Sequence, residues 1–169
     1  MKLSRRSALA LVPGTFVFLA SSRDALAETV VKVSLWDKGE ASMDGMDTLM
    51  PMGMEMPGAM MDKATMGITL DAVEIPAGKV TFRVINDSQE FYHSVTISPV
   101  ADPSRELPYL IDKMMVDETA AGITARVKEL RPHDSGSVTV DMQPGTYILY
   151  CNIAGHYVMG MWTTVTVTP

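Results

Sequence analysis

Seven short stretches of the chain alternate apolar and polar side chains, and this alternation limits the fold more than any other feature. A period of two is typical of β-strands that bury one face. Pro and Gly residues mark turns between the stretches, as at 76–78 and 144–145. Seven short strands with little helical pattern predict an all-β, antiparallel sandwich. The expected strands cover residues 29–36, 66–75, 79–86, 93–97, 137–142, 146–151 and 162–167.

Residues 98–128 interrupt this series of strands. The part from 98 to 109 is loop-like, and residues 117–130 could carry one or two helical turns. We therefore expect a second insertion, between the central strands of the sandwich.

The first 27 residues have the pattern of a cleaved export signal. Basic residues up to Arg6 precede an apolar stretch of 13 residues at 8–20, and a small-residue cleavage site ends at Ala27. A membrane span needs roughly 20 apolar residues, so this stretch is too short to be an anchor. The arginine pair partly resembles a twin-arginine signal. We expect residues 28–169 to form a single exported, soluble domain in the periplasm, without stable membrane insertion.

The predicted mature domain is acidic. Without residues 1–27, it has 10 Lys and Arg residues and 19 Asp and Glu residues. Such a charge argues against binding to nucleic acid or to anionic membranes, and it is compatible with a basic protein partner.

Residues 43–66 contain nine of the fifteen methionines of the chain. Gly, Pro and Asp are interleaved with them, so the segment cannot keep a helical or strand period, and we expect a Met-rich loop. Two interpretations remain open: a soft-metal tract, because thioethers favour Cu(I), or an adaptable apolar surface that packs over another part. The candidate Cu(I) ligands are Met43, Met46, Met50, Met52, Met54, Met56, Met60 and Met61.

Cys151 is the only cysteine of the chain, and an exported thiol is prone to oxidation unless it is buried or bound. It ends a predicted strand, and His156 follows in the next loop. His93 begins another strand, with its apolar face predicted to point inward. Two imidazoles, a thiolate and a methionine thioether are the ligand set of a type-1 blue copper site. We therefore expect one copper ion, cycling between Cu(I) and Cu(II), on these three residues and a methionine.

Other interpretations of these residues fit less well. Structural zinc seldom uses methionine and prefers closed sets of Cys and His. A Cys–His nucleophile would need an orienting group and a substrate-binding motif, and the sequence offers neither. The third histidine, His133, stands between Arg131 and Asp134 without a second histidine nearby, so we expect a solvated loop residue.

Together with His93, segments 75–87 and 130–167 resemble a cupredoxin, and they are most similar to the rusticyanin and sulfocyanin-like branch. In that branch the ligand loop is also Cys-x4-His-x4-Met, and some members carry a long Met- and Gly-rich insertion. The resemblance implies a Greek-key β-sandwich with copper ligands at His93, Cys151, His156 and a methionine of the loop. It also implies a tyrosine corner at Tyr147. Ser94 is a departure, because many cupredoxins have an asparagine there that braces the ligand loop.

Spacing alone leaves both Met159 and Met161 open as the fourth ligand. Two features favour Met161: it directly precedes the last strand, and Gly160 lets the loop turn tightly before it. The branch that the chain resembles also has Gly-Met at this place. Met159 would then lie on the surface around His156, within an apolar patch for partner docking.

A blue copper site passes single electrons, and we expect a periplasmic electron carrier that uses the solvent-side edge of His156. The expected partner is a redox protein such as a cytochrome or an oxidase, and the carrier is expected to be monomeric. Three histidines cannot supply the additional copper clusters of multicopper enzymes, so no enzymatic activity is expected. The alternative is a periplasmic copper chaperone or buffer protein that uses its Met-rich loop for Cu(I).

Overall fold

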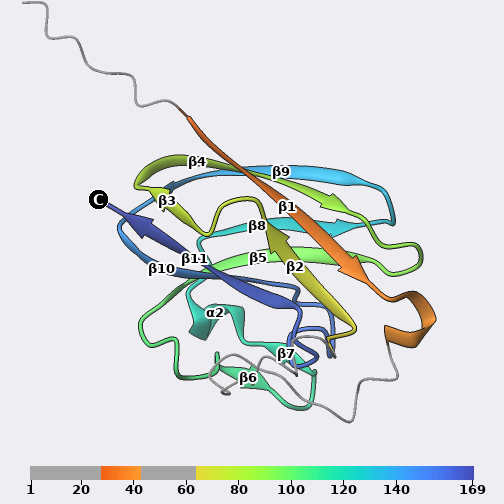
Figure 1. The fold of residues 1–169 in the computed structure, drawn as a ribbon. Helices are drawn as coiled ribbons and strands as arrows, with labels where there is room; N and C mark the ends of the chain where they lie inside the picture. Colours follow the sequence, from red (N-terminus) through yellow and green to blue (C-terminus); the bar gives the residue numbers. More distant parts are fainter. Residues whose placement is uncertain (1–27, 43–63) are drawn as a thin grey trace, which may run out of the picture.

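The alternating stretches of the sequence form strands that stack as two sheets (Figure 1). The computed structural model describes residues 28–42 and 64–169. The strands of the two sheets are β1 (Thr29–Asp37), β2 (Met66–Leu70), β3 (Glu74–Pro76), β4 (Gly78–Asn86), β5 (His93–Val100), β8 (Ala125–Leu130), β9 (Ser135–Met142), β10 (Gly145–Tyr150) and β11 (Trp162–Thr168). One sheet has the order β2-β1-β4-β9 and the other has the order β3-β11-β10-β5-β8. The predicted β-sandwich is confirmed.

Alternate residues of each strand fill the space between the two sheets, as the period of two predicts. Burial of these aliphatic and aromatic side chains is the main force that holds the sheets together, at about 1.5–3 kcal/mol for each large side chain. The core includes Val31, Val33, Leu35, Val80, Phe82, Val84, Val95, Ile97, Leu149, Val165 and Val167. The predicted tyrosine corner is present, because the hydroxyl of Tyr147 donates to the carbonyl of Gln143 at 3.1 Å.

The structure differs from the predicted strands in three ways. The stretch 66–75 divides into β2 and β3, because the chain leaves one sheet and enters the other. Two strand pairs, β1 with β4 and β3 with β11, are parallel, so the sandwich is mixed where an antiparallel one was expected. Residues 125–130, expected to be loop or helix, form β8 and pair with β5.

The segment between β5 and β8 covers the outer face of the second sheet. It contains β6 (Tyr109–Leu110), β7 (Met115–Val116) and one helical turn, α2 (Glu118–Ala121), which lie together at one end of the sandwich (Figure 1). Leu107 and Val116 pack with Ile148 and Tyr150, whose side chains point away from the main core. As a result β10 is buried on both faces, and the residues beside Cys151 are shielded from water.

Met66 is not part of a loop, although the predicted Met-rich loop includes it. It is the first residue of β2 and lies fully buried in the core, so the prediction of a loop over 43–66 is wrong at this residue. Its thioether fills core space, as methionine often does. The predicted export signal, 1–27, and the candidate Cu(I) ligands from Met43 to Met61 lie outside the described residues. In the described part of the chain, no helix has the length and hydropathy that a membrane span requires.

Candidate metal centre

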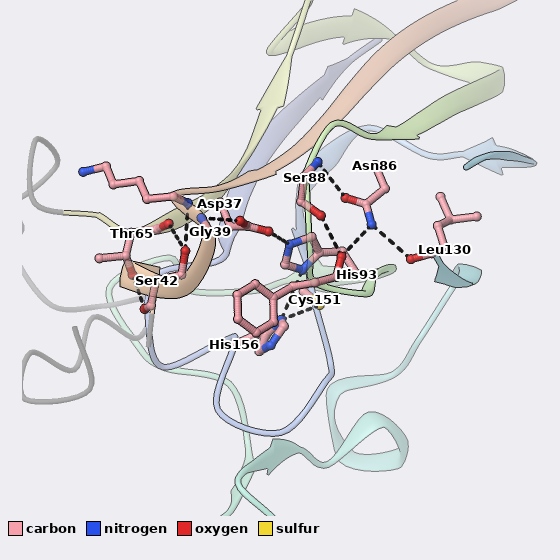
Figure 2. A network of polar contacts seen from close by, with 12 residues as sticks. Asp37, Gly39, Ser42, Thr65, Asn86, Ser88, His93, Leu130, Cys151 and His156 are labelled. Carbon is pink, nitrogen blue, oxygen red and sulfur yellow. Dashed lines mark hydrogen bonds and ion pairs between the residues drawn. The ribbon is translucent and has the colours of Figure 1, made fainter. Parts of the chain in front are cut away.

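Three predicted ligands meet at one end of the sandwich. His93 is the first residue of β5, Cys151 directly follows β10, and His156 lies in the loop between β10 and β11 (Figure 2). One ligand atom from each residue lies within 4.8 Å of the other two. All three side chains are buried, with His156 retaining 5% of its exposure. The pairing of β5 with β10 brings the first two residues together, and the loop returns the third.

The loop from Cys151 to Met161 is a compact series of turns. Within it, backbone N–H groups donate from His156 to Ile153 at 3.0 Å and from Met161 to His156 at 3.0 Å. Gly160 has a φ of +91°, which only glycine adopts readily, as expected of a tight turn before the last strand. The N–H of Cys151 donates to the carbonyl of Met161 at 3.1 Å and closes the loop. This backbone framework holds His156 close to Cys151.

The thiol of Cys151 is fully buried in the main core cluster, with a few directed donors beside it. The backbone N–H of Ser94 points at its sulfur at 3.3 Å, and the Ser94 hydroxyl lies 3.6 Å from the same atom. The hydroxyl also accepts the N–H of Asn152 at 3.3 Å, so Ser94 braces the ligand loop where many cupredoxins use asparagine. Burial raises the pKa of the Cys151 thiol, although N–H groups of Ser94 and Ile153 oppose the rise. A coordinated metal ion would lower the pKa of this thiol, because the ion binds the thiolate form.

The two imidazoles present their Nδ1 atoms to the sulfur. Nδ1 of His156 lies 3.4 Å from the sulfur of Cys151 and 3.3 Å from Nδ1 of His93. On its far side, Nε2 of His93 donates to a carboxylate oxygen of Asp37 at 2.9 Å (Figure 2). Since an ionised carboxylate only accepts, the proton of His93 lies on Nε2 and leaves a lone pair on Nδ1.

Burial also keeps both imidazoles neutral. Desolvation lowers the pKa of His93, and the hydrogen bond that its ring donates to Asp37 opposes that decrease. The pKa of His156 is lowered to about 4, first by desolvation and then by the nearby His93. Neutral imidazoles are the form that binds a metal ion. Two such nitrogens and a protected sulfur converging at one point fit a copper ion, which accepts both imidazole and thiolate ligands.

Two residues of the site were missed by the sequence reasoning. Asp37, the partner of His93, occupies the next alternate position of β1 after the buried Val33 and Leu35. This position in the alternation could have identified it from the sequence. Asn86 is fully buried at the end of β4, and its amide donates to the carbonyls of Phe91 at 2.9 Å and Leu130 at 3.0 Å. It thereby fixes the loop that leads into His93 (Figure 2). No local pattern marks that role, because its acceptors come from two separate segments.

The remaining candidates lie in different environments. Met161 is fully buried and belongs to the core cluster that includes Cys151. Met159 is also buried, with 2% of its side chain exposed, so the prediction that it lies on a docking surface is wrong. The turn that places the N–H of Met159 on the carbonyl of Gly155 directs its side chain inward. His133 is exposed and stands apart from the cluster, as expected of a solvated loop residue.

The sequence also matches a known family over most of the sandwich. Residues 57–168 match the model of the copper binding proteins of the plastocyanin/azurin family. The chain belongs to this family. It is a cupredoxin with copper as its cofactor, and the cluster of His93, Cys151 and His156 is compatible with a type-1 site.

Solved structures of this cupredoxin's fold include rusticyanin from Thiobacillus ferrooxidans, with a TM-score of 0.50 at 21% identity. That match covers 84% of this chain and 79% of rusticyanin. The auracyanin of the photosynthetic bacterium Roseiflexus castenholzii matches with a TM-score of 0.45 at 25% identity, over 60% of this chain and 88% of its own. No curated protein matched the sequence.

The low pKa of His156 predicts how the metal-free protein responds to acid. The unfolded chain binds a proton near pH 6.5, whereas the folded protein does so only near pH 4. Stability therefore falls as pH drops from 6.5 to 4, by about 3 kcal/mol over the full window. His93 acts in the same direction. Urea unfolding of the metal-free protein between pH 7 and pH 4 measures the loss.

Two histidine variants separate this effect from the general titration of carboxyl groups. His156→Gln is expected to lose the share of the pH dependence between 6.5 and 4 that comes from His156, because glutamine cannot take up the proton, while the share from His93 and the carboxyl groups remains. His133→Gln replaces an exposed histidine outside the cluster and is expected to keep the dependence of the parent. Equal pH dependence in both variants would contradict the assignment to His156.

Proposed function

We propose that this protein is a periplasmic electron carrier with one type-1 copper ion bound by His93, Cys151, His156 and Met161. The observation that carries the proposal is the buried convergence of two neutral imidazole nitrogens on one thiol sulfur in a copper-binding family. Copper bound there would supply one-electron chemistry between Cu(I) and Cu(II). The export signal predicted at 1–27 supports the location.

The protein residues contribute a rigid, dry frame. His93 is held by Asp37, and the loop that carries His156 and Met161 is closed by backbone hydrogen bonds onto Cys151. Ligands fixed in advance need little rearrangement when the charge of a bound ion changes, which lowers the barrier to electron transfer. A donor to the sulfur from Ser94 stabilises its thiolate form.

His156 provides the route to a partner in this proposal. Its Nδ1 faces the sulfur, so the opposite edge of the ring faces away from the cluster, and 5% of the side chain remains exposed. A redox protein, for example a cytochrome or an oxidase, would dock over this edge with the carrier as a monomer. We propose no enzymatic activity, because a site with four protein ligands has no open position for substrate.

Optical and electrochemical measurements test the proposed function. The protein loaded with one equivalent of Cu(II) should be blue or green and should cycle reversibly between its two oxidation states. Electron exchange with a periplasmic cytochrome, followed by stopped-flow absorption, then measures carrier activity. A colourless Cu(II) complex would overturn the proposal.

The Met-rich segment supports a second candidate function, in copper handling. Eight methionines in residues 43–61 exceed what one type-1 site requires, and thioethers favour Cu(I). A copper chaperone or buffer would bind additional Cu(I) through this segment, whereas a carrier binds one copper. Stoichiometry therefore distinguishes the two functions.

Deleting residues 43–61 is expected to reveal which function the segment serves. Residues 62–64 would still join Ser42 to Thr65. These two residues are already in contact, because the hydroxyl of Thr65 donates to the carbonyl of Ser42 at 2.8 Å. If the segment is a copper trap, titration of Cu(I) against a competing chelator should lose all binding beyond one equivalent. If it shields the site, the stoichiometry should stay at one while the reduction potential falls, because water would then reach the copper.

A variant with Met114→Leu alone is the matched control for methionine loss. Met114 is half-exposed and lies outside the segment; its carbonyl accepts the N–H of Gly155 in the ligand loop at 2.7 Å, and leucine keeps this backbone bond, so neither the copper stoichiometry nor the potential should change. An unchanged stoichiometry and potential after the deletion would rule out both roles for the segment.

A further inference from the structure

Asp37 is a buried carboxylate held between a copper ligand and a turn. Its Oδ2 atom accepts from Nε2 of His93 at 2.9 Å, and its Oδ1 atom accepts from the N–H of Gly39 at 2.7 Å (Figure 2). The side chains of Asp37 and His93 are both fully buried. Each carboxylate oxygen therefore has a defined donor, and the group has little freedom to rotate.

The turn that carries Gly39 is itself hydrogen-bonded to Thr65, the residue before β2. The N–H of Lys38 donates to the hydroxyl of Ser42 at 2.7 Å and to the carbonyl of Thr65 at 2.9 Å. The Ser42 hydroxyl in turn donates to the same carbonyl at 3.1 Å (Figure 2). Asp37 is thus positioned by β1 on one side and by a closed turn on the other, independently of His93.

The carboxylate of Asp37 faces the imidazole of His93 at 2.9 Å, and the side chains of both residues are buried. Burying a carboxylate without a cation is costly, so such a group is retained where a positive charge is nearby. A Cu(II) ion with the Cys151 thiolate and the Asp37 carboxylate has a net charge of zero, whereas Cu(I) leaves one negative charge.

We propose that Asp37 is a positioning residue for the copper site, which holds His93 with Nδ1 toward Cys151 and lowers the reduction potential. The proposal rests on the proposed copper binding at His93. Two effects act together. The charge of the carboxylate favours the more positive oxidation state, and its hydrogen bond makes Nδ1 a stronger donor. Ligating histidines that donate to a carboxylate behave in this way at other metal sites.

The decisive variant is Asp37→Asn, which keeps the shape and an acceptor oxygen but removes the charge. Changes in such outer partners typically cost 10–100-fold in metal affinity. We expect a loss of this size for Cu(II) and a smaller loss for Cu(I), measured with competing chelators for each ion. Every tenfold difference between the two losses raises the reduction potential by about 59 mV. The blue colour should remain, because Cys151 is unchanged.

Asp87→Asn is the matched control. Asp87 accepts from the hydroxyl of Ser34 near the end of β1, but it is exposed and does not contact His93. Its replacement should leave both affinities and the potential unchanged, since solvent screens an exposed charge. Equal potentials in the parent, Asp37→Asn and Asp87→Asn proteins would overturn the proposal for Asp37 and leave the copper site intact. A colourless parent would instead overturn the proposed copper function.

A measurement on the metal-free parent protein does not depend on the folding of any variant. Nitrogen NMR of the histidine rings should find the proton of His93 on Nε2, where Asp37 accepts it. A proton on Nδ1 would overturn the proposal, because the carboxylate would then not set the orientation of the ligand. Rescue supports a specific role further: Asp37→Glu retains the charge and should lie closer to the parent potential than Asp37→Asn.

Discussion

Replacing Cys151 with serine is expected to remove the intense visible absorption of the Cu(II)-loaded protein completely. That absorption comes from charge transfer between a thiolate sulfur and Cu(II), and a hydroxyl cannot supply it. The fold should persist, because the N–H of Ser94 that now points at the sulfur can donate to the new oxygen. Visible absorption of the loaded protein, together with the unfolding midpoint of the metal-free protein, measures both results.

His133→Ala is the control for loss of a metal-binding residue type, since His133 is exposed and outside the cluster. It should keep the full absorption of the parent. Persistent colour in Cys151→Ser would mean that the chromophore is not the thiolate, and our assignment of the site would fail.

The second large effect concerns the fourth ligand. Met161→Leu is expected to keep copper and colour but to raise the reduction potential, because loss of a weak axial donor disfavours Cu(II). A tenfold shift in the ratio of Cu(I) to Cu(II) affinity corresponds to about 59 mV, and we expect at least this change. Cyclic voltammetry of Met161→Leu and Met159→Leu compares the reduction potentials of the two variants. Leucine fills nearly the same volume as methionine, so the stability cost should stay below about 1.5 kcal/mol.

Met159→Leu is the matched substitution in the same loop. Both methionines are buried, so the two variants remove the same chemical group from similarly packed places. Met161 differs because its backbone is tied directly to two other proposed ligands: its N–H donates to His156 and its carbonyl accepts from Cys151. If Met159→Leu changes the potential and Met161→Leu does not, Met159 is the axial ligand.

The period of two was sufficient to predict most of the sandwich, because burial of one strand face is recorded in each strand's own residues. It could not predict β8, whose single buried residue, Val127, leaves no alternation to detect. A local sequence pattern also cannot predict whether two paired strands run parallel or antiparallel. The parallel pairing of β1 with β4 depends on the path of the intervening chain between the two sheets.

The proposed ligands were predictable for a different reason: Cys151 and His156 share one loop, and few other residues of the chain could serve. Their surroundings depend on contacts between distant segments. Asp37 and His93 are hydrogen-bonded although 56 positions separate them in the sequence, and 44 positions separate Asn86 from Leu130, to which it donates. The burial of Met159 likewise follows from turns within the loop, which a strand parity argument does not describe.

The closed turn at Ser42 and Thr65 affects how the sequence between these two residues could vary in evolution. The two residues are joined by hydrogen bonds in both directions, so the chain leaves and re-enters the sandwich at a single point. A segment inserted there adds little closure entropy as it lengthens, since the cost grows only with the logarithm of its length. We therefore expect the length of this connection to vary at little cost in stability, while the turn keeps Asp37 and His93 in place.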